Sequence, residues 1–412
     1  MTIPVKTLAA IPEHFTMTED EIRSKFPTRL CGYDLYRKIG SPKLVVAPMV
    51  DQSELAWRIL SRRYNAQLCY TPMINAKLFY QANKGYIKEQ WQTNDNDRPV
   101  IVQFCANDPD MLLNAAKLVV EGADAVDLNL GCPQNIAKRG HYGSYLMEDW
   151  DLISKLIRKL HENLEIPVTA KIRVYPDVEK TVEYAKMVEA AGAQMITVHG
   201  RLRDQRGHKT GLADWAKIRA VKEAVNVPVF ANGNILYYED IQRCIEETGV
   251  DGVMSAETNL YNPALFSGKI LPTWKLATEY MEICQQVPTK FSYIRGHLFK
   301  LFRNSLPVHT DLRQQLVAAE TLEDYDQFTK DIETRLIEEA NVSSFDPDHI
   351  EKDEHGYRKY PHWICQPALR FEHDKQRSHT KRLLNEAEAD KQKNNNTINE
   401  NTDSKRLKST AI

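Results

Sequence analysis

The stretch Ala125-Val-Asp-Leu-Asn-Leu-Gly-Cys-Pro-Gln134 decides how the fold is interpreted. Its valine and leucine side chains alternate as in a buried β-strand, because successive side chains of a strand point to opposite faces. The opposite face carries Asp127 and Asn129, and Cys132 follows between a glycine and a proline. A buried strand that brings a carboxylate, an amide and a thiol to one end predicts a functional site at that end.

Seven further apolar runs recur along the chain, and amphipathic stretches with apolar residues at helical spacing lie between them. Eight strand-helix repeats are typical of a (β/α)8 barrel, or TIM barrel, and we predict this α/β fold. The expected strands lie within 44–50, 68–73, 100–105, 125–134, 168–174, 195–200, 227–233 and 250–255. The clearest helices between them are expected at 150–162, 178–191, 215–224 and 238–247.

Polar residues recur at the ends of the predicted strands. In such a barrel the outward face of each strand packs on helices, whereas inward residues near the C-terminal ends line the mouth, where active sites lie. A lone buried polar residue is usually a hydrogen-bonded core group. Here five strands end alike, which favours one shared site formed by Gln103, Asp127, Asn129, Lys171, Arg173, His199 and Asn232.

The pattern changes after about residue 275, where helical periodicity at 273–284, 291–304 and 321–340 replaces the strand pattern. We predict a small all-helical domain there. Between residues 286 and 313 five basic residues and one acidic residue give a local charge of +4, and four aromatic residues are interleaved with them. This composition is typical of a surface that binds a phosphate backbone, although an amphipathic helix with an ordinary solvated basic face would also explain it.

The domain organisation follows from these changes. We predict an N-terminal extension at 1–40, the barrel at 41–274, the helical domain at 275–345 and a polar, partly disordered tail at 346–412. One apolar island in the tail, near 360–370, is expected to dock on the folded body. The short basic cluster at 405–408 is compatible with a nuclear signal but is more often a solubilising tail.

The composition limits the classes of protein that the sequence fits. The 412 residues carry a formal net charge of -2, so no global basic field indicates nucleic acid. The seven cysteines form no C-x-x-C pair and no His/Cys cluster with zinc spacing, so we expect reduced thiols and no metal. The chain shows neither a targeting segment nor a membrane span, so we expect a soluble, monomeric protein in the cytoplasm, with a nuclear location also open.

Six short motifs follow one another along the chain: Ala47-Pro-Met49, Val102-Gln-Phe104, Asn129-Leu-Gly-Cys-Pro133, Ala170-Lys-Ile-Arg173, Thr197-Val-His-Gly-Arg201 and Ala231-Asn-Gly-Asn-Ile235. In these motifs and in their order the sequence resembles the tRNA-dihydrouridine synthase family, flavin enzymes that reduce particular uridines of tRNA. The longer stretches at 47–57 and 131–143 are similar to the eukaryotic branch that acts on tRNA positions 16 and 17.

The resemblance implies flavin mononucleotide (FMN) as cofactor and NADPH as reductant. It places Pro48, Met49 and Val50 under the flavin ring. The polar edge of the ring would meet Gln103, Lys171 and His199. The phosphate would lie at the loops after the seventh and eighth strands, near Asn232, Gly233, Asn234, Ala256 and Glu257.

The implied substrate is a uridine swung out of the tRNA fold, because only an extruded base can lie on a flavin in the barrel mouth. Cys132 would donate a proton to C5 of the uracil, and Asn129 and Arg173 would bind its edge. Further tRNA contacts are expected from Lys138, Arg139, His141 and Arg201 in the loops, and from Lys290, Arg295, Lys300 and Arg303 in the helical domain.

Four positions depart from the family's pattern. Many members have Gly-Arg where this chain has Ala256-Glu257, so no arginine at that turn can contact the phosphate. Thr258 stands where relatives in this branch tend to have glycine, and Asn234 stands where many members have aspartate. Backbone amides, with an arginine from elsewhere, would then hold the phosphate.

Two other functions fit part of the pattern. A flavin barrel that reduces or oxidises a free pyrimidine would use similar polar groups but would not need the basic helical domain. A tRNA-binding protein that kept the fold and lost catalysis would explain the departures at Glu257 and Thr258.

Overall fold

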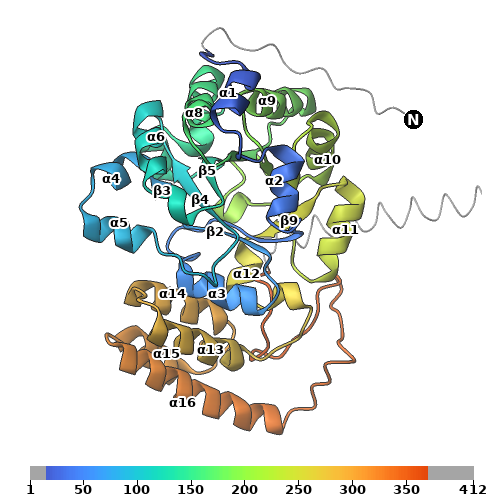
Figure 1. Ribbon diagram of the computed structural model, residues 1–412. Helices are drawn as coiled ribbons and strands as arrows, with labels where there is room; N and C mark the ends of the chain where they lie inside the picture. Colours follow the sequence, from blue (N-terminus) through green and yellow to red (C-terminus); the bar gives the residue numbers. More distant parts are fainter. Residues whose placement is uncertain (1–14, 370–412) are drawn as a thin grey trace, which may run out of the picture.

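The computed structural model describes residues 15–369 (Figure 1). The first 14 residues and residues 370–412, which include most of the predicted polar tail and its basic cluster, lie outside the described residues.

Eight parallel strands close into a barrel, as predicted. β1 pairs with both β2 and β9, β2 pairs with β4, and each remaining strand pairs with the next. A short ninth strand, β3, pairs with the C-terminal end of β4. The strands are β1 (Leu44–Val46), β2 (Leu68–Tyr70), β3 (Ile74–Asn75), β4 (Val100–Cys105), β5 (Ala125–Leu130), β6 (Val168–Arg173), β7 (Ile196–His199), β8 (Val229–Asn232) and β9 (Gly252–Ser255).

The register of neighbouring strands places the polar residues in two adjacent rows near the C-terminal ends of the strands. Across β5 and β6, Asn129 lies opposite Lys171. Arg173 lies opposite His199, which in turn lies opposite Asn232. Because all the strands run in the same direction, these side chains meet at the C-terminal mouth of the barrel.

Helices surround the strands, and four of the larger ones begin at an aspartate. Asp108, Asp149, Asp177 and Asp214 accept backbone N–H groups of the first turns of α6, α8, α9 and α10, which satisfies donors that have no partner inside the helix. The barrel helices are α3 (Leu55–Arg63), α4 (Ala76–Gln81), α5 (Lys84–Gln90), α6 (Pro109–Lys117), α7 (Asn135–Gly140), α8 (Trp150–Asn163), α9 (Val178–Ala190), α10 (Trp215–Ala224), α11 (Glu239–Thr248) and α12 (Glu257–Tyr261). Short 3-10 turns are η1 (Val120–Gly122), η2 (Gly143–Leu146), η3 (Gly207–Lys209) and η4 (Leu265–Ser267).

Two N-terminal helices, α1 (Glu19–Lys25) and α2 (Gly32–Lys38), pack on the outside and the N-terminal end of the barrel. Arg158 of α8 ties α1 to the barrel through an ion pair of 2.7 Å with Glu19. Leu35 and Tyr36 of α2 join a core cluster with Phe230 inside the barrel. The end of the barrel opposite the mouth is therefore closed by apolar packing.

A helical layer of α13 (Thr273–Gln286), α14 (Phe291–Leu301), α15 (Thr310–Ala318) and α16 (Leu322–Asn341) lies below the barrel in Figure 1. Its core is shared with α3, which contributes Trp57 and Leu60. The indole of Trp57 stacks on the imidazole of His297 with centroids 3.9 Å apart. Glu54 accepts His297 Nε2 at 2.9 Å and the hydroxyl of Tyr280 at 2.8 Å. This buried polar contact fixes the helical layer beside the loop that follows β1.

The segment after α16 returns to the barrel. The N–H of Thr273 donates to the carbonyl of Trp363 at 2.7 Å, and the N–H of Cys365 donates to the carbonyl of Leu271 at 3.0 Å. Arg358 pairs with Glu239 of α11 at 2.8 Å. The segment therefore connects the helical layer to the barrel over residues 343–369. Across the part of the chain that the structure describes, no helix combines the length and apolarity that crossing a membrane requires.

The buried ion pair of Arg58 and Asp97 predicts a large stability effect. Asp97 accepts Nε and Nη2 of Arg58, at 3.1 Å and 2.6 Å, and both side chains are shielded from solvent. Asp97→Ala leaves an uncompensated buried guanidinium and should lower the free energy of unfolding by about 3–5 kcal/mol, measured by urea denaturation. The matched control is Asp34→Ala, which removes the exposed pair with Arg37 and should cost at most about 1 kcal/mol. Equal losses for the two variants would contradict the prediction.

Candidate active site

A chain of buried hydrogen bonds forms one side of the barrel mouth. The carboxylate of Asp127 accepts the hydroxyl of Thr169 at 2.6 Å and the side-chain amide of Gln103 at 2.8 Å. The oxygen of Gln103 accepts Nδ2 of Asn129 at 2.8 Å. Burial raises the pKa of Asp127 to about 6 despite these bonds. The orientations of the two amides are therefore set by one buried carboxylate.

Asn129 continues this chain into the loop that carries Cys132. Its Oδ1 accepts the backbone N–H groups of Gly131 at 3.1 Å and Cys132 at 2.9 Å. The carbonyl of Cys132 accepts both the N–H and the hydroxyl of Ser144, at 3.1 Å and 3.0 Å. Gly143 has φ +65°, and a Cβ there would lie 2.8 Å from that carbonyl. The backbone of Cys132 is thus held on both sides, just beyond the end of β5.

Lys171 lies on the neighbouring strand, β6, and points inward. Its Nζ donates to Oδ1 of Asn232 at 2.9 Å, and Asn232 donates in turn to the carbonyl of Met254 at 3.0 Å. Burial, together with the charge of Arg173, lowers the pKa of Lys171 to about 7. The ammonium is thus poised to lose or keep its proton near neutral pH, and a bound anion would stabilise its charged form.

Arg173 lies beside this lysine, and Arg201 lies beside Arg173. Arg173 donates to the carbonyls of Gly131 at 2.7 Å and Leu202 at 2.8 Å, and burial and the charge of Arg201 lower its pKa to about 10. Arg201 donates to the carbonyl of Gly211 at 3.0 Å. Three cations thus gather at the mouth, and the electrostatic neighbours of Lys171 and Arg173 include Cys132. Such a group of charges favours an anionic ligand.

His199 is neutral in this environment. Burial and the three neighbouring cations lower its pKa well below the usual value. Nη1 of Arg201 lies 3.1 Å from Nε2 of His199, and a guanidinium can only donate, so the hydrogen of the neutral ring is on Nδ1. The imidazole therefore offers a hydrogen-bond donor rather than a charge.

The turn after β8 contains the predicted phosphate residues. Gly233 has φ +118°, and a Cβ there would lie 2.6 Å from the methyl group of Ala213, so only glycine fits. The side chain of Asn234 exchanges hydrogen bonds with the backbone of Ala213, at 2.8 Å and 2.7 Å, and accepts Nη2 of Arg201 at 3.2 Å. The amide therefore brings an arginine to this turn.

The turn after β9 explains one departure from the family's pattern. Thr258 is buried, and its hydroxyl donates to the carbonyl of Ile235 at 2.6 Å, which ties the turns after β8 and β9 together. Ala256 precedes α12, and Glu257 begins it. Glu257 interacts electrostatically with Lys300 of α14, so this turn lies beside the helical layer.

The loop after β1 carries the three residues predicted to lie under a ring. Pro48 and Met49 are half-buried, whereas Val50 is 54% exposed. The N–H of Met49 donates to the hydroxyl of Ser53 at 3.0 Å. Met49 packs against three separate core clusters, which fixes this loop between the barrel and the helical layer.

The basic residues predicted in the loops around the mouth differ in their exposure and in their contacts. Lys138, Arg139 and His141 are exposed on and after α7. Arg206 donates to the carbonyl of Pro133 and thereby clamps the loop that follows Cys132.

The four basic residues of the helical layer also differ from one another. Lys290 pairs with Glu89 of α5 at 2.5 Å. Arg295 is engaged inside the layer, where it donates to the hydroxyl of Tyr325 and the carbonyl of Ala319. Lys300 is half-buried, and Arg303 is exposed with its guanidinium 5.3 Å from the ring centroid of Tyr261.

Two residues of the site were missed by sequence reasoning. Thr169 lies two positions before Lys171 on the inner face of β6, so strand alternation could have identified it. Ser144, which holds the carbonyl of Cys132, lies in a turn twelve residues further along the chain, and no pattern in the sequence marks it.

A closed parallel barrel with a cationic, hydrogen-bonded mouth defines a TIM-barrel enzyme. The chain belongs to the dihydrouridine synthase family, because the family model "Dihydrouridine synthase (Dus)" matches residues 45–345.

Curated relatives agree with this assignment. The chain is 52% identical over 370 residues to the tRNA-dihydrouridine(16/17) synthase [NAD(P)(+)] of Saccharomyces cerevisiae, with 83% of this chain and 87% of the yeast protein covered. It is 50% identical over 350 residues to the corresponding "-like" protein of Mus musculus, with 83% of this chain and 71% of the mouse protein covered. Identity to the mouse tRNA-dihydrouridine(20a/20b) synthase [NAD(P)+]-like protein is 38% over 257 residues, with 62% and 78% covered.

The buried lysine predicts a characteristic pH dependence of stability. The pKa of Lys171 falls from 10.5 to about 7 on folding, so the folded state bears the cost of a buried charge below pH 7. This cost is relieved as the pH rises from about 7 toward 10.5. Lys171→Met should therefore raise the melting temperature of the ligand-free protein more at pH 6 than at pH 9, as measured by calorimetry. The exposed-lysine control, Lys117→Met, should show no such trend. A gain for Lys171→Met that grows with pH would contradict the prediction.

Proposed function

We propose that this protein is an FMN-dependent tRNA-dihydrouridine(16/17) synthase, which uses NADPH to reduce uridine to 5,6-dihydrouridine in the tRNA D loop. Identity of about one half, over most of both chains, to proteins that carry this name supports the proposal. The lower identity and coverage to a 20a/20b protein favour positions 16 and 17. The structural observation that carries the proposal is Cys132 held at the mouth next to the buried cations Lys171 and Arg173.

The residues of the mouth fit a flavin nucleotide. The cations Lys171, Arg173 and Arg201 suit an anionic cofactor. Only glycine fits at Gly233, so the backbone of that turn is open to close approach by a phosphate. Arg201, brought to the turn by Asn234, would supply the arginine contact that Glu257 cannot provide.

FMN, when bound, would accept hydride from NADPH and pass hydride to C6 of the uracil. Lys171 would provide positive charge where the reduced ring carries negative charge. Nδ1–H of His199 would donate a hydrogen bond at the polar edge of the ring, and the amide of Gln103 would donate or accept one there. Asp127 would keep Gln103 in the orientation that this contact requires.

The reaction also needs a proton at C5 of the uracil, and we assign this step to Cys132. A protonated thiol can act as a general acid and donate its hydrogen to a carbanion-like carbon. Hydride arrival at C6 leaves negative charge over C5 and O4, and transfer of the thiol proton to C5 completes the reduction. The nearby cations Lys171 and Arg173 would stabilise the thiolate that remains.

The tRNA would approach across the helical layer. α14 lies beside the loop after β1, since a Cβ at Gly296 would lie 3.4 Å from the amide of Gln52. Lys300 and Arg303 on and after this helix are available to meet backbone phosphates. A reductase of free pyrimidines would need no such surface, and a protein without activity would need no thiol held at the mouth.

The test of catalysis is dihydrouridine formation in unmodified tRNA by the purified, yellow protein with NADPH. Cys132→Ala should keep bound flavin, flavin reduction by NADPH and tRNA binding, while product formation falls by about 10²- to 10⁴-fold. Cys284→Ala, at a buried cysteine in the helical layer, serves as the control and should retain activity. Near-normal turnover by Cys132→Ala would remove the thiol from the mechanism, and a colourless protein that cannot be reconstituted with FMN would refute the cofactor.

The test of tRNA binding is the double variant Lys300→Glu/Arg303→Glu. Each lost phosphate contact should reduce the slope of log affinity against log salt by about 0.7 to 0.9. Arg295 is left unchanged because it holds the helical layer together. The control is Arg335→Glu, which removes a surface charge already paired with Asp311. An unchanged affinity and salt slope in the double variant would exclude this surface.

A further inference from the structure

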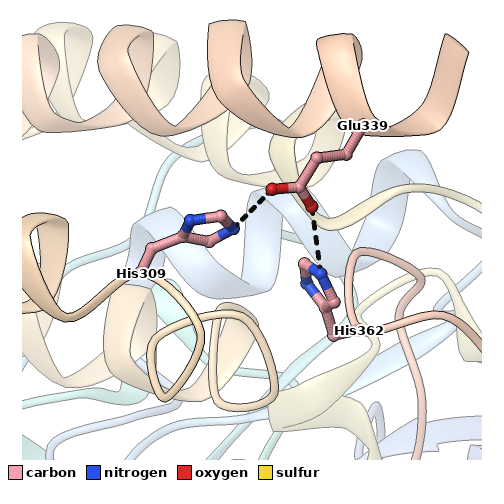
Figure 2. Close-up of side chains that lie close together, drawn as sticks. All are labelled: His309, Glu339 and His362. Carbon is pink, nitrogen blue, oxygen red and sulfur yellow. Dashed lines mark ion pairs between the residues drawn. The ribbon is translucent and has the colours of Figure 1, made fainter. Parts of the chain in front are cut away.

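A second cluster of potential ligands lies away from the barrel mouth, where three segments of the chain meet. His309 precedes α15, Glu339 lies near the end of α16, and His362 lies in the segment that returns to the barrel. Figure 2 shows that both imidazoles point at the same carboxylate. Nε2 of His309 lies 3.2 Å from Oε1 of Glu339, and Nε2 of His362 lies 3.0 Å from Oε2.

The hydrogen bonds of Ser305 show which nitrogen of His362 is free to bind an ion. The hydroxyl of Ser305 donates its hydrogen to the carbonyl of His362 at 3.0 Å. Nδ1 of His362 lies 3.2 Å from the same hydroxyl oxygen, which can therefore only accept the hydrogen of Nδ1. In the neutral ring Nε2 then carries a lone pair, which faces a carboxylate oxygen. Two lone pairs at 3.0 Å repel each other unless a proton or a metal ion lies between them.

The imidazole of His309 also faces the carboxylate of Glu339, and it is more deeply buried than that of His362. Its side chain is 7% exposed, and its buried Nε2 has no hydrogen-bond partner although Oε1 of Glu339 is within 3.2 Å. A buried ring nitrogen that points at a carboxylate without forming a hydrogen bond is an unsatisfied polar group, which costs free energy in the folded protein. A cation shared by the three side chains would satisfy both imidazoles and the carboxylate at once.

The distances suit a transition metal. Zinc binds histidine nitrogen and carboxylate oxygen at about 2.0–2.2 Å, so tetrahedral ligand atoms lie about 3.3–3.6 Å apart. The two N–O separations here are 3.2 Å and 3.0 Å, and all ligand atoms lie within 4.8 Å of one another. Small rotations of the side chains would complete the site. The hydrogen bond of Ser305 to His362 is the second-sphere contact that typically orients a metal-binding imidazole.

We propose that His309, Glu339 and His362 bind a divalent transition metal of the zinc class, with water as a fourth ligand. The absence of zinc-type spacing in the sequence predicted no metal, but these three residues are separated by 30 and 23 positions and form no motif. Because the ligands come from three segments, the ion fastens the segment 343–369 to the helical layer. The proposal is independent of the reaction at the barrel mouth.

The test is zinc binding by the purified full-length protein. After dialysis against a chelator and titration with Zn²⁺, the unmodified protein should bind about one zinc per chain, as measured by elemental mass spectrometry and calorimetry. Glu339→Gln should abolish this binding, and Ser305→Ala should weaken it roughly 10- to 100-fold. The matched control is His349→Ala, which removes a histidine from the same returning segment, 85% exposed and paired with Asp346, and should leave zinc binding unchanged.

X-ray absorption of the zinc-loaded unmodified protein gives a test that does not depend on the folding of any variant. Nitrogen and oxygen neighbours at about 2.0–2.2 Å, without sulfur, support the site. Sulfur neighbours would assign the ion to cysteines. Failure of the unmodified protein to bind zinc would mean that the two histidines and Glu339 form only ion pairs. Either result overturns the proposal, as does unchanged zinc affinity in Glu339→Gln.

Discussion

The site depends on the requirement that the buried carboxylate of Asp127 be hydrogen-bonded. A carboxylate inside a barrel costs several kcal/mol unless donors surround it, and here Thr169 and Gln103 are those donors. Once Gln103 gives its N–H group to Asp127, its oxygen is left to accept Asn129. Asn129 must then turn its own oxygen toward the backbone of the loop after β5, which positions Cys132. A buried carboxylate inside the barrel thus determines where the backbone of Cys132 lies.

A second constraint positions the helical layer. Glu54 follows the loop after β1 and is buried against His297 and Tyr280, while Trp57 stacks on the same histidine. Because the partners of Glu54 come from α13 and α14, removing the layer would leave a carboxylate unsatisfied inside the protein. The barrel and the layer are consequently one packed unit at this contact. The layer in turn lies beside the mouth, where a large substrate must enter.

Sequence reasoning worked best where one physical rule acts locally. Alternation along strands located the barrel and assigned Lys171 to its inner face, and the structure confirms the eight strands. It worked less well for charged residues, whose role depends on distant partners. Arg295 and Arg303 lie in the same basic stretch with interleaved aromatic residues. The guanidinium of Arg295 nevertheless donates to the hydroxyl of Tyr325 within the helical layer. Thr258 looked like a defect in a phosphate turn, whereas its hydroxyl joins two turns of the mouth.

The sequence by itself determined the order of strands and helices, the polar ends of the strands and the loop of Cys132, because periodicity and turn chemistry are local properties. Only the tertiary structure decided which polar groups satisfy one another. The neutral state of His199 arises from burial and from the charges of Lys171 and Arg173 on β6 and of Arg201 in the loop after β7. The meeting of His309, Glu339 and His362 depends on how the chain returns after α16. Such contacts join residues far apart in the chain, so their geometry is fixed by packing and cannot be inferred from spacing.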